Sequence, residues 1–184
     1  MKLWLVRHAQ VLIDKGICYG VSDISCDPIA TSNAADNFAK FPSKRATLWT
    51  SPLQRAYKLA EAIKLKRPDI QGPIVDQRLL EMDFGCWEMS PWNEIPKQNY
   101  DSWVADFANY RFGEKESTLE VIDRVSRALK DVISSRNETV WVTHAGVIKA
   151  IQYVISKKSP HKSLTAQDWP SESIALGSWI CIKV

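Results

Sequence analysis

Two short apolar runs, each followed at once by a histidine, constrain the fold of this chain more than any other feature. The first run spans Leu3 to Val6 and leads to His8, and the second spans Val140 to Val142 and leads to His144. Short runs that are apolar throughout are typical of strands buried on both faces of a parallel sheet. Because open α/β sheets bind ligands at the carboxyl ends of their strands, both imidazoles are predicted to lie at a ligand-binding edge.

The remaining periodicity indicates alternating strands and helices. This alternation predicts a three-layer α/β/α sandwich around a mostly parallel sheet. Further strands are expected at Thr47 to Trp49, Pro73 to Asp76, Arg78 to Glu81 and Glu138 to Thr143, with one or two closing segments between Ile174 and Val184.

The starts of two helices can be placed from capping signals. Ser51 and Pro52 are expected to cap and open one helix, which would put Arg55 in its first turn. Ser117 to Glu120 is a capping-box signature ahead of a long amphipathic helix. Apolar residues at helical spacing also predict helices that include Ala34 to Phe41 and Val147 to Ile155.

Length and composition favour one globular domain over residues 1–184. An apolar content of 45% over 184 residues allows a full core, and 24 basic against 21 acidic residues is too even a balance for a nucleic-acid partner. No apolar stretch is long enough for a membrane span or a signal-peptide core. The cysteines show no metal-binding or disulfide pattern, so reduced thiols and a cytoplasmic location are expected. They are Cys18, Cys26, Cys86 and Cys181.

Residues 83–116 differ from the rest of the chain in composition. Aromatic residues crowd this segment, and Pro91 and Pro96 interrupt it. We expect it to form a small lid inserted within the single domain. Most of its rings are predicted to pack inside the lid, and one or two could stack on a flat part of a substrate.

The polar residues at the predicted sheet edge suit the chemistry of a phosphate monoester. Such a substrate carries close to two negative charges, and Arg7, Arg55 and His144 can donate hydrogen bonds to it. A neutral His8 can act as nucleophile, and Glu81 can protonate the leaving oxygen and later activate water. His8 must then present a lone pair, whereas His144 is expected to be cationic beside the dianion.

The same residues also have simpler interpretations. Each histidine could be structural, Arg55 could be an ordinary surface residue of its helix, and Glu81 could be solvated at a strand end. The two histidines and Glu81 could instead bind Zn²⁺, although Arg7 and Arg55 would repel a cation.

Three weaker candidates lie outside this set. Tyr19 and Gly20 belong to a turn, for which contact with substrate is the alternative to a purely structural role. His161 lies in a polar stretch and is expected at the surface.

Four segments resemble, in order, the motifs of the histidine phosphatase superfamily, which includes the cofactor-dependent phosphoglycerate mutases. The resemblance implies a phosphoglycerate mutase-like fold, His8 as nucleophile, Glu81 as proton donor, and no metal or cofactor. It also implies a phosphate pocket made by Arg7, Arg55 and His144. The matching segments are Arg7 to His8, Ser51 to Ala56, Leu80 to Glu88 and Thr143 to Gly146.

Within that superfamily, the short length and the segments Ile17 to Gly20 and Phe84 to Glu88 are most similar to α-ribazole phosphatase-like members. These act on a nucleotide-like precursor in cobalamin biosynthesis. The resemblance therefore implies a phosphatase for a small phosphorylated metabolite such as α-ribazole 5′-phosphate. A phosphoglycerate mutase-type phosphotransferase, a phosphoprotein phosphatase and a catalytically silent phosphate-binding module remain as alternatives. The oligomeric state is left open.

Three positions depart from the family pattern. Ala9 stands where glycine is usual, Gln10 where an acidic residue is usual, and Asp14 where asparagine is usual. The change at Ala9 is mild if its φ is negative. Because an anionic Asp14 in the pocket would repel phosphate, its side chain is expected to point away or its loop to follow a different register.

Overall fold

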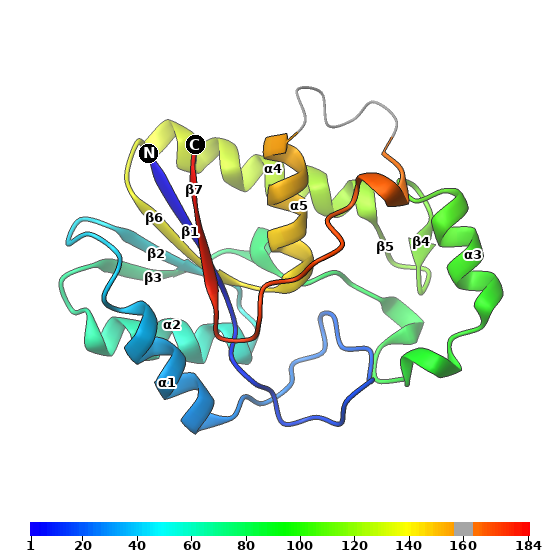
Figure 1. Ribbon diagram of the computed structural model, residues 1–184, viewed down its shortest axis with the longest axis horizontal. Coiled ribbons are helices and arrows are strands. Elements are labelled where there is room, and N and C mark those ends of the chain that lie inside the picture. The colour runs from blue at the N-terminus through cyan, green and yellow to red at the C-terminus, as the bar shows by residue number, and fades with distance from the viewer. Residues whose placement is uncertain (157–163) are drawn as a thin grey trace.

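The computed structural model describes residues 1–156 and 164–184, which form three layers with a sheet in the middle (Figure 1). This arrangement confirms the predicted α/β fold. The strands are β1 (Lys2–Arg7), β2 (Thr47–Thr50), β3 (Gln71–Val75), β4 (Arg111–Phe112), β5 (Glu116–Ser117), β6 (Thr139–Thr143) and β7 (Trp179–Lys183). The helices are α1 (Pro28–Phe38), α2 (Gln54–Lys66), α3 (Lys97–Ala105), α4 (Thr118–Ser135) and α5 (Ala145–Ser156).

The main sheet has five strands in the order β3-β2-β6-β1-β7. β1, β2, β3 and β6 run parallel, and β7 runs antiparallel to β1 at one edge. β6 lies between β1 and β2, with Val142 opposite both Val6 and Thr50. The segments that follow these three strands therefore leave the sheet at neighbouring points of one edge.

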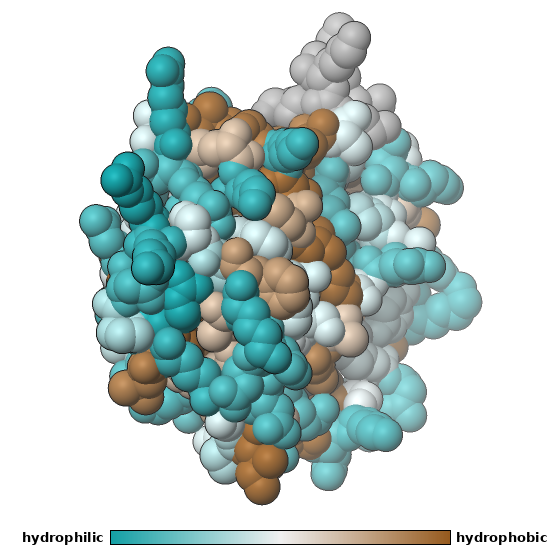
Figure 2. All heavy atoms as spheres, turned by 60° about the vertical axis from the view of Figure 1, so that its left-hand side comes forward, coloured by the Kyte–Doolittle hydropathy of each residue, from teal (hydrophilic) through white to brown (hydrophobic). Residues whose placement is uncertain are grey.

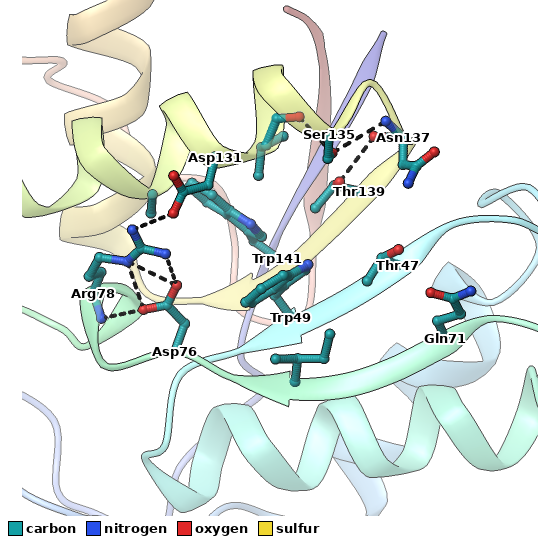
Figure 3. Close-up of a pocket in the computed structure, with 13 residues that line it drawn as sticks. Thr47, Trp49, Gln71, Asp76, Arg78, Asp131, Ser135, Asn137, Thr139 and Trp141 are labelled. Atoms are coloured by element: carbon teal, nitrogen blue, oxygen red, sulfur yellow. Dashed lines mark hydrogen bonds and ion pairs between the residues drawn. The ribbon is translucent and has the colours of Figure 1, made fainter.

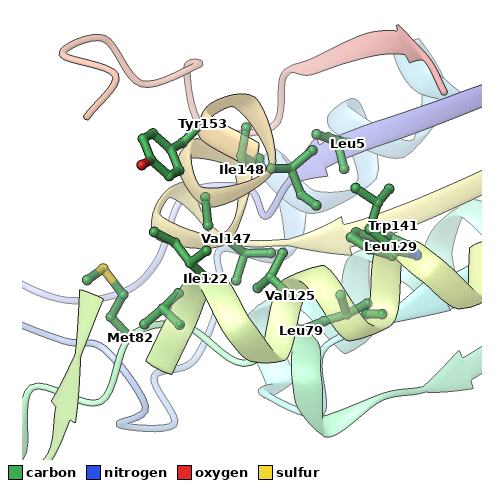
Figure 4. Close-up of a cluster of buried hydrophobic side chains, with 14 of the residues drawn as sticks. Leu5, Leu79, Met82, Ile122, Val125, Leu129, Trp141, Val147, Ile148 and Tyr153 are labelled. Carbon is green, nitrogen blue, oxygen red and sulfur yellow. The ribbon is translucent and has the colours of Figure 1, made fainter. Parts of the chain in front are cut away.

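The sheet is buried on both faces, which explains the uninterrupted apolar run of β1. Leu3 and Leu5 face the core beneath α4 and α5, whereas Trp4 and Val6 face the core beneath α1 and α2. Figure 4 shows Val125 of α4, Val147 of α5 and their neighbours packed against Leu5 and Trp141 of the sheet. Alternate side chains of a strand point to opposite faces, so a strand covered by helices on both sides must be apolar at every position.

Helix α2 begins later than its sequence suggests. It starts at Gln54, and its N-cap residue Leu53 offers no side-chain hydrogen bond, so the predicted cap at Ser51 is wrong. Asp23 instead accepts a hydrogen bond from the backbone N of Gln54 at 2.7 Å. Arg55 still lies in the first turn, as predicted.

The stretch before Glu81 is not extended, contrary to the prediction. A 3-10 turn spans Gln77–Leu79, because Asp76 accepts a hydrogen bond from the backbone N of Arg78 at 2.8 Å and bends the chain. Glu81 therefore reaches the sheet edge from a loop and does not close a strand. Phe41 also lies beyond its predicted helix, which ends at Phe38.

The aromatic segment, residues 83–116, forms one end of the molecule, with α3 and the β4-β5 pair (Figure 1). Its rings pack on one another: Trp103 stacks on Phe107 with centroids 5.7 Å apart, and Trp87 lies 6.1 Å from Tyr100. Phe84 and Phe112 extend this packing into the core beneath α4 and α5.

Within the described part of the chain, no helix is long and apolar enough to cross a membrane. All four cysteines are free thiols. The position predicted for His161 lies outside the described residues.

Candidate active site

The carboxyl ends of β1, β6 and β2 bring the two predicted histidines and Arg55 to one place. His8 directly follows β1, and its backbone N donates to the oxygen of Thr143 at 3.0 Å. The ring centroids of His8 and His144 are 5.2 Å apart. Ser51 follows β2, and its backbone N donates to the backbone oxygen of Val142 at 3.0 Å. The turn leading to Arg55 therefore starts at the same edge.

His8 is held as a neutral ring with one free nitrogen. Its Nδ1 lies 2.8 Å from the carbonyl oxygen of Ala9, and because a carbonyl only accepts, Nδ1 must carry the proton. Burial, together with the positive charges of Arg55 and Arg7, lowers the pKa of His8 to about 3, although the Ala9 hydrogen bond opposes this shift. Near neutral pH, Nε2 therefore presents a lone pair.

His144 differs from its predicted state. Burial lowers its pKa well below the ordinary value, and Arg55 and His8 add to the effect, so the ring is neutral here. A cation at this position would require a negative charge beside it. Nε2 of His144 lies 2.8 Å from Oγ of Ser51, a contact that the sequence did not reveal because Ser51 resembled a helix cap.

Arg55 is fully buried and is held by one loop. Its two terminal nitrogens donate to the backbone oxygens of Ser22 at 2.7 Å and Gly20 at 2.5 Å. The guanidinium carbon lies 5.3 Å from the ring centroid of Tyr19. These contacts fix the orientation of the guanidinium and leave its Nε and further N–H groups for another acceptor.

Buried side-chain nitrogens without partners gather around His8. Arg7 uses one terminal nitrogen to donate to Ile174 at 2.7 Å, but its Nε is unpartnered. Among the described residues, the buried side-chain N and O atoms that lack a hydrogen bond are Nε of Arg7, Nε of Arg55, Nδ1 of His144 and Oγ of Ser126. An unsatisfied buried polar group costs about 1–3 kcal/mol, and three of these four belong to one site. Such a concentration is typical of a pocket that binds an anion.

A carboxylate outside the predicted site organises the loop that holds Arg55. Glu88 accepts hydrogen bonds from the backbone N of Gly20, Val21 and Ser22, each at about 3 Å, and from the Ser22 hydroxyl at 2.5 Å. It also accepts from the backbone N of Phe84 at 3.0 Å. Glu88 thus ties the loop at residues 20–22 to the aromatic segment.

This arrangement separates the two weaker candidates. Gly20 gives its amide to Glu88 and does not line the cavity described below. A side chain at Gly20 would place its Cβ 1.8 Å from the backbone oxygen of Met82, so only glycine fits there. Tyr19, by contrast, lines the cavity.

Glu81 lies at the N-terminus of α5. Its carboxylate accepts hydrogen bonds from the backbone N of Met82 and of Gly146, both at 3.0 Å. A Cβ at Gly146 would lie 2.4 Å from the nearer oxygen of Glu81, so the glycine permits this close approach. The first turn of α5 therefore positions the carboxylate that the sequence singled out.

Arg124 of α4 fixes the loop that carries Glu81. It donates to the backbone oxygens of Leu80 at 2.7 Å and Glu81 at 3.1 Å, and it forms a salt bridge of 2.7 Å with Glu116. In the sequence, Arg124 is one of several charged residues of this helix, so no local signal pointed to the contact.

A cavity of about 270 Å³ opens onto His8. Arg55 and His144 are fully buried and are not among its lining residues. Asp14 is exposed and lies outside the lining, as its departure from the family pattern required. Ala9 is absent from the described residues with positive φ, so that change is mild. The polar lining residues are Arg7, His8, Tyr19, Glu81, Lys149 and Ser173, and the main apolar ones are Ile17, Met82, Phe84, Trp92 and Trp169.

A second cleft, of about 260 Å³, lies between α4 and the strands β2, β3 and β6 (Figure 3). Trp49, Trp141 and Arg78 line it. The guanidinium of Arg78 forms salt bridges with Asp76 and with Asp131, each at 2.7 Å. Its lining contains no histidine, cysteine or unpaired cation, so the cavity at His8 is the better candidate.

Two further observations concern the surface and metal binding. On the face shown in Figure 2, apolar side chains form a narrow strip bordered by hydrophilic ones.

Within the described residues, no group of three His, Cys, Asp or Glu side chains could hold a metal ion. His8, His144 and Glu81 therefore do not form the zinc site considered as an alternative.

The low pKa of His8 predicts a loss of folding stability in acid. Between its ordinary value of 6.5 and about 3, the unfolded chain binds a proton that the folded protein does not. The free energy of unfolding should be unaffected by this group above pH 6.5 and should fall below it, by up to about 1.4 kcal/mol per pH unit. Urea unfolding at pH 7, 6 and 5 would measure the slope. The His8→Asn variant should show a shallower slope, and an unchanged slope would contradict the assignment.

Comparison with known protein families shows which family this chain matches. Residues 3–170 match the model of the histidine phosphatase superfamily, branch 1. The chain belongs to this family. A relative from Hydrogenobacter thermophilus, named "Putative phosphoserine phosphatase 2", is 34% identical over 158 residues, which cover 82% of this chain and 76% of the relative. The Arabidopsis thaliana "6-phosphofructo-2-kinase/fructose-2,6-bisphosphatase" is 28% identical over 149 residues, which cover 76% of this chain but only 19% of that protein.

Solved structures of other proteins show the same fold. A mycobacterial glucosyl-3-phosphoglycerate phosphatase matches with a TM-score of 0.78 and 20% identity, covering 98% of this chain and 88% of its own. A phosphoglycerate mutase from Thermus thermophilus matches with a TM-score of 0.74 and 23% identity, covering 99% and 92%. These matches show the phosphoglycerate mutase-like fold, and none of them specifically supports the α-ribazole phosphatase branch.

Proposed function

We propose that this chain is a metal-independent phosphomonoester hydrolase that works through a phosphohistidine at His8. One observation carries the proposal: a neutral, buried imidazole with a free Nε2 is surrounded by buried side-chain nitrogens that have no hydrogen-bond partner. A lone pair suits attack on phosphorus, and the unpaired donors of Arg7, Arg55 and His144 suit the negatively charged oxygens around it. Membership of the histidine phosphatase superfamily supports the same chemistry.

In the proposed reaction, Nε2 of His8 forms a bond to phosphorus as the bond from phosphorus to the leaving oxygen breaks. Glu81 gives its proton to that oxygen, which departs as an alcohol. The Glu81 carboxylate then takes a proton from water, whose oxygen bonds to phosphorus as the bond from phosphorus to Nε2 breaks. Inorganic phosphate leaves, and His8 and protonated Glu81 are restored.

The cavity favours a small phosphorylated metabolite as substrate. Its volume of about 270 Å³ is below the roughly 300–1,000 Å³ typical of pockets for drug-sized ligands. α-Ribazole 5′-phosphate is one such metabolite. Phe84 and Trp92 belong to the aromatic segment and line the cavity, so we propose that this segment is the lid and that its position limits substrate size.

Hydrolysis in the presence of a chelator tests the proposed function. The purified protein should release phosphate from p-nitrophenyl phosphate in excess EDTA, and rapid quenching should trap an acid-labile phosphoenzyme. A panel of O-phosphoserine, 3-phosphoglycerate and α-ribazole 5′-phosphate would rank the substrates. Loss of activity in EDTA would contradict metal independence, and phosphate binding without release would favour a silent module. Phosphoryl transfer to a second metabolite without release would favour a mutase.

A further inference from the structure

Lys149 lines the active-site cavity but has no role in the proposed reaction. It lies on α5, one helical turn after Ala145, which also lines the cavity. This spacing places both side chains on the same side of the helix. The partly buried Lys149 side chain therefore belongs to the wall of the space in which a leaving group would lie.

The amine of Lys149 has little to balance its charge. It donates one hydrogen bond, to the backbone oxygen of Ser171 at 3.2 Å, so two of its three N–H groups remain available. No described carboxylate lies within salt-bridge distance of its Nζ. Burial and the positive charge of Arg7 lower the pKa of Lys149, whereas Glu81 raises it.

Other groups around the cavity show what this amine could bind. Arg7 and Lys149 are its cations, and Glu81 is its acid. Arg7 is adjacent to His8 and is assigned to the phosphoryl group by the proposed function. Lys149 is thus the cation left for a different part of the substrate, and a neighbouring negative charge would stabilise its ammonium group.

We infer that Lys149 forms a second anion-binding position, which selects phosphate monoesters whose leaving group carries a carboxylate. This inference rests on the proposed function and names its substrate class. A carboxylate accepts hydrogen bonds from an ammonium group and is small enough to share a cavity of about 270 Å³ with a phosphoryl group. Lys149 then contributes to substrate specificity, whereas His8 and Glu81 act on the bond between phosphorus and the leaving oxygen.

Matched substrates isolate the contribution of the carboxylate. O-Phosphoserine and O-phosphoethanolamine differ only in this group, and 3-phosphoglycerate and glycerol 1-phosphate differ in having a carboxylate or a hydroxymethyl group at the same carbon. The wild type should show the higher kcat/KM for the carboxylate member of each pair. Lys149→Met, which keeps the aliphatic chain but removes the charge, should lower kcat/KM for that member roughly 10- to 100-fold. It should leave the other member within about twofold.

Two further variants separate recognition from a structural role. Lys149→Arg keeps the positive charge and should retain most of the preference. Lys58→Met alters an exposed lysine of α2 and should leave kcat/KM unchanged for both members of each pair. An equal loss for both members in Lys149→Met would show that Lys149 only holds the backbone at Ser171, and would overturn the inference.

Failure of this inference is distinguishable from failure of the proposed function. Hydrolysis of p-nitrophenyl phosphate that depends on His8, with no preference within either pair, would reject only the role of Lys149. Absence of hydrolysis of every compound, p-nitrophenyl phosphate included, would reject the proposed function and this inference with it.

Discussion

Replacing His8 with alanine is expected to abolish phosphatase activity, with kcat/KM lower by at least about four orders of magnitude. No neighbouring group can take its place. The ring of His144 is close, but its Nε2 contacts Ser51, and the ring does not line the cavity. Steady-state hydrolysis of p-nitrophenyl phosphate in EDTA would measure the loss, and no phosphoenzyme should be trapped.

Phosphate binding provides the control for the His8 variant. The donors of Arg7, Arg55 and His144 remain in His8→Ala, so inorganic phosphate should still raise its melting temperature, as binding to the folded state requires. A variant that melts cooperatively and responds to phosphate is folded, and its inactivity can then be assigned to the missing nucleophile. Substantial remaining hydrolysis would contradict a phosphohistidine at this position.

Replacing Glu81 with glutamine is expected to reduce activity by an amount that depends on the leaving group. A general acid contributes roughly 10²- to 10⁴-fold when the leaving oxygen needs a proton. An alkoxide needs one, whereas nitrophenolate leaves readily without it. The kcat for O-phosphoserine should therefore fall by this factor, and the first turnover of p-nitrophenyl phosphate should be much less affected.

The glutamine variant keeps the local geometry. Its side-chain oxygen can still accept from the backbone N of Gly146, as the carboxylate does at 3.0 Å. Glu94→Gln, at an exposed position, is a matched control and should be unchanged. Pre-steady-state rates with both substrates would make the comparison. Equal losses for the alkyl and aryl substrates would show that Glu81 does not protonate the leaving group.

Local sequence patterns predict the framework of the site but not the network that supports it. The positions of His8 and His144 follow from two buried strands, because a continuous apolar run ending in a polar residue marks a strand end. The start of α2 was misplaced, because the hydroxyl of Ser51 contacts a histidine 93 residues away. No periodicity records such a distant contact.

The same limit applies to Glu88 and Arg124. Glu88 is bonded to a backbone amide 68 residues earlier, and Arg124 to a backbone oxygen 43 residues earlier. Each looks like an ordinary charged residue in its own segment. Their contacts exist only after the loops have been folded against the sheet, so they become visible only in three dimensions.

The position of Glu88 couples two properties that an enzyme engineer would prefer to vary separately. One carboxylate holds the amides of residues 20–22, whose carbonyls grip Arg55, and also the amide of Phe84, whose ring forms part of the outer wall. Shifting that wall outward to admit a bulkier alcohol would also displace the loop that holds the Arg55 guanidinium. Broader substrate range should thus come with a slower reaction, unless the two loops are first given independent anchors.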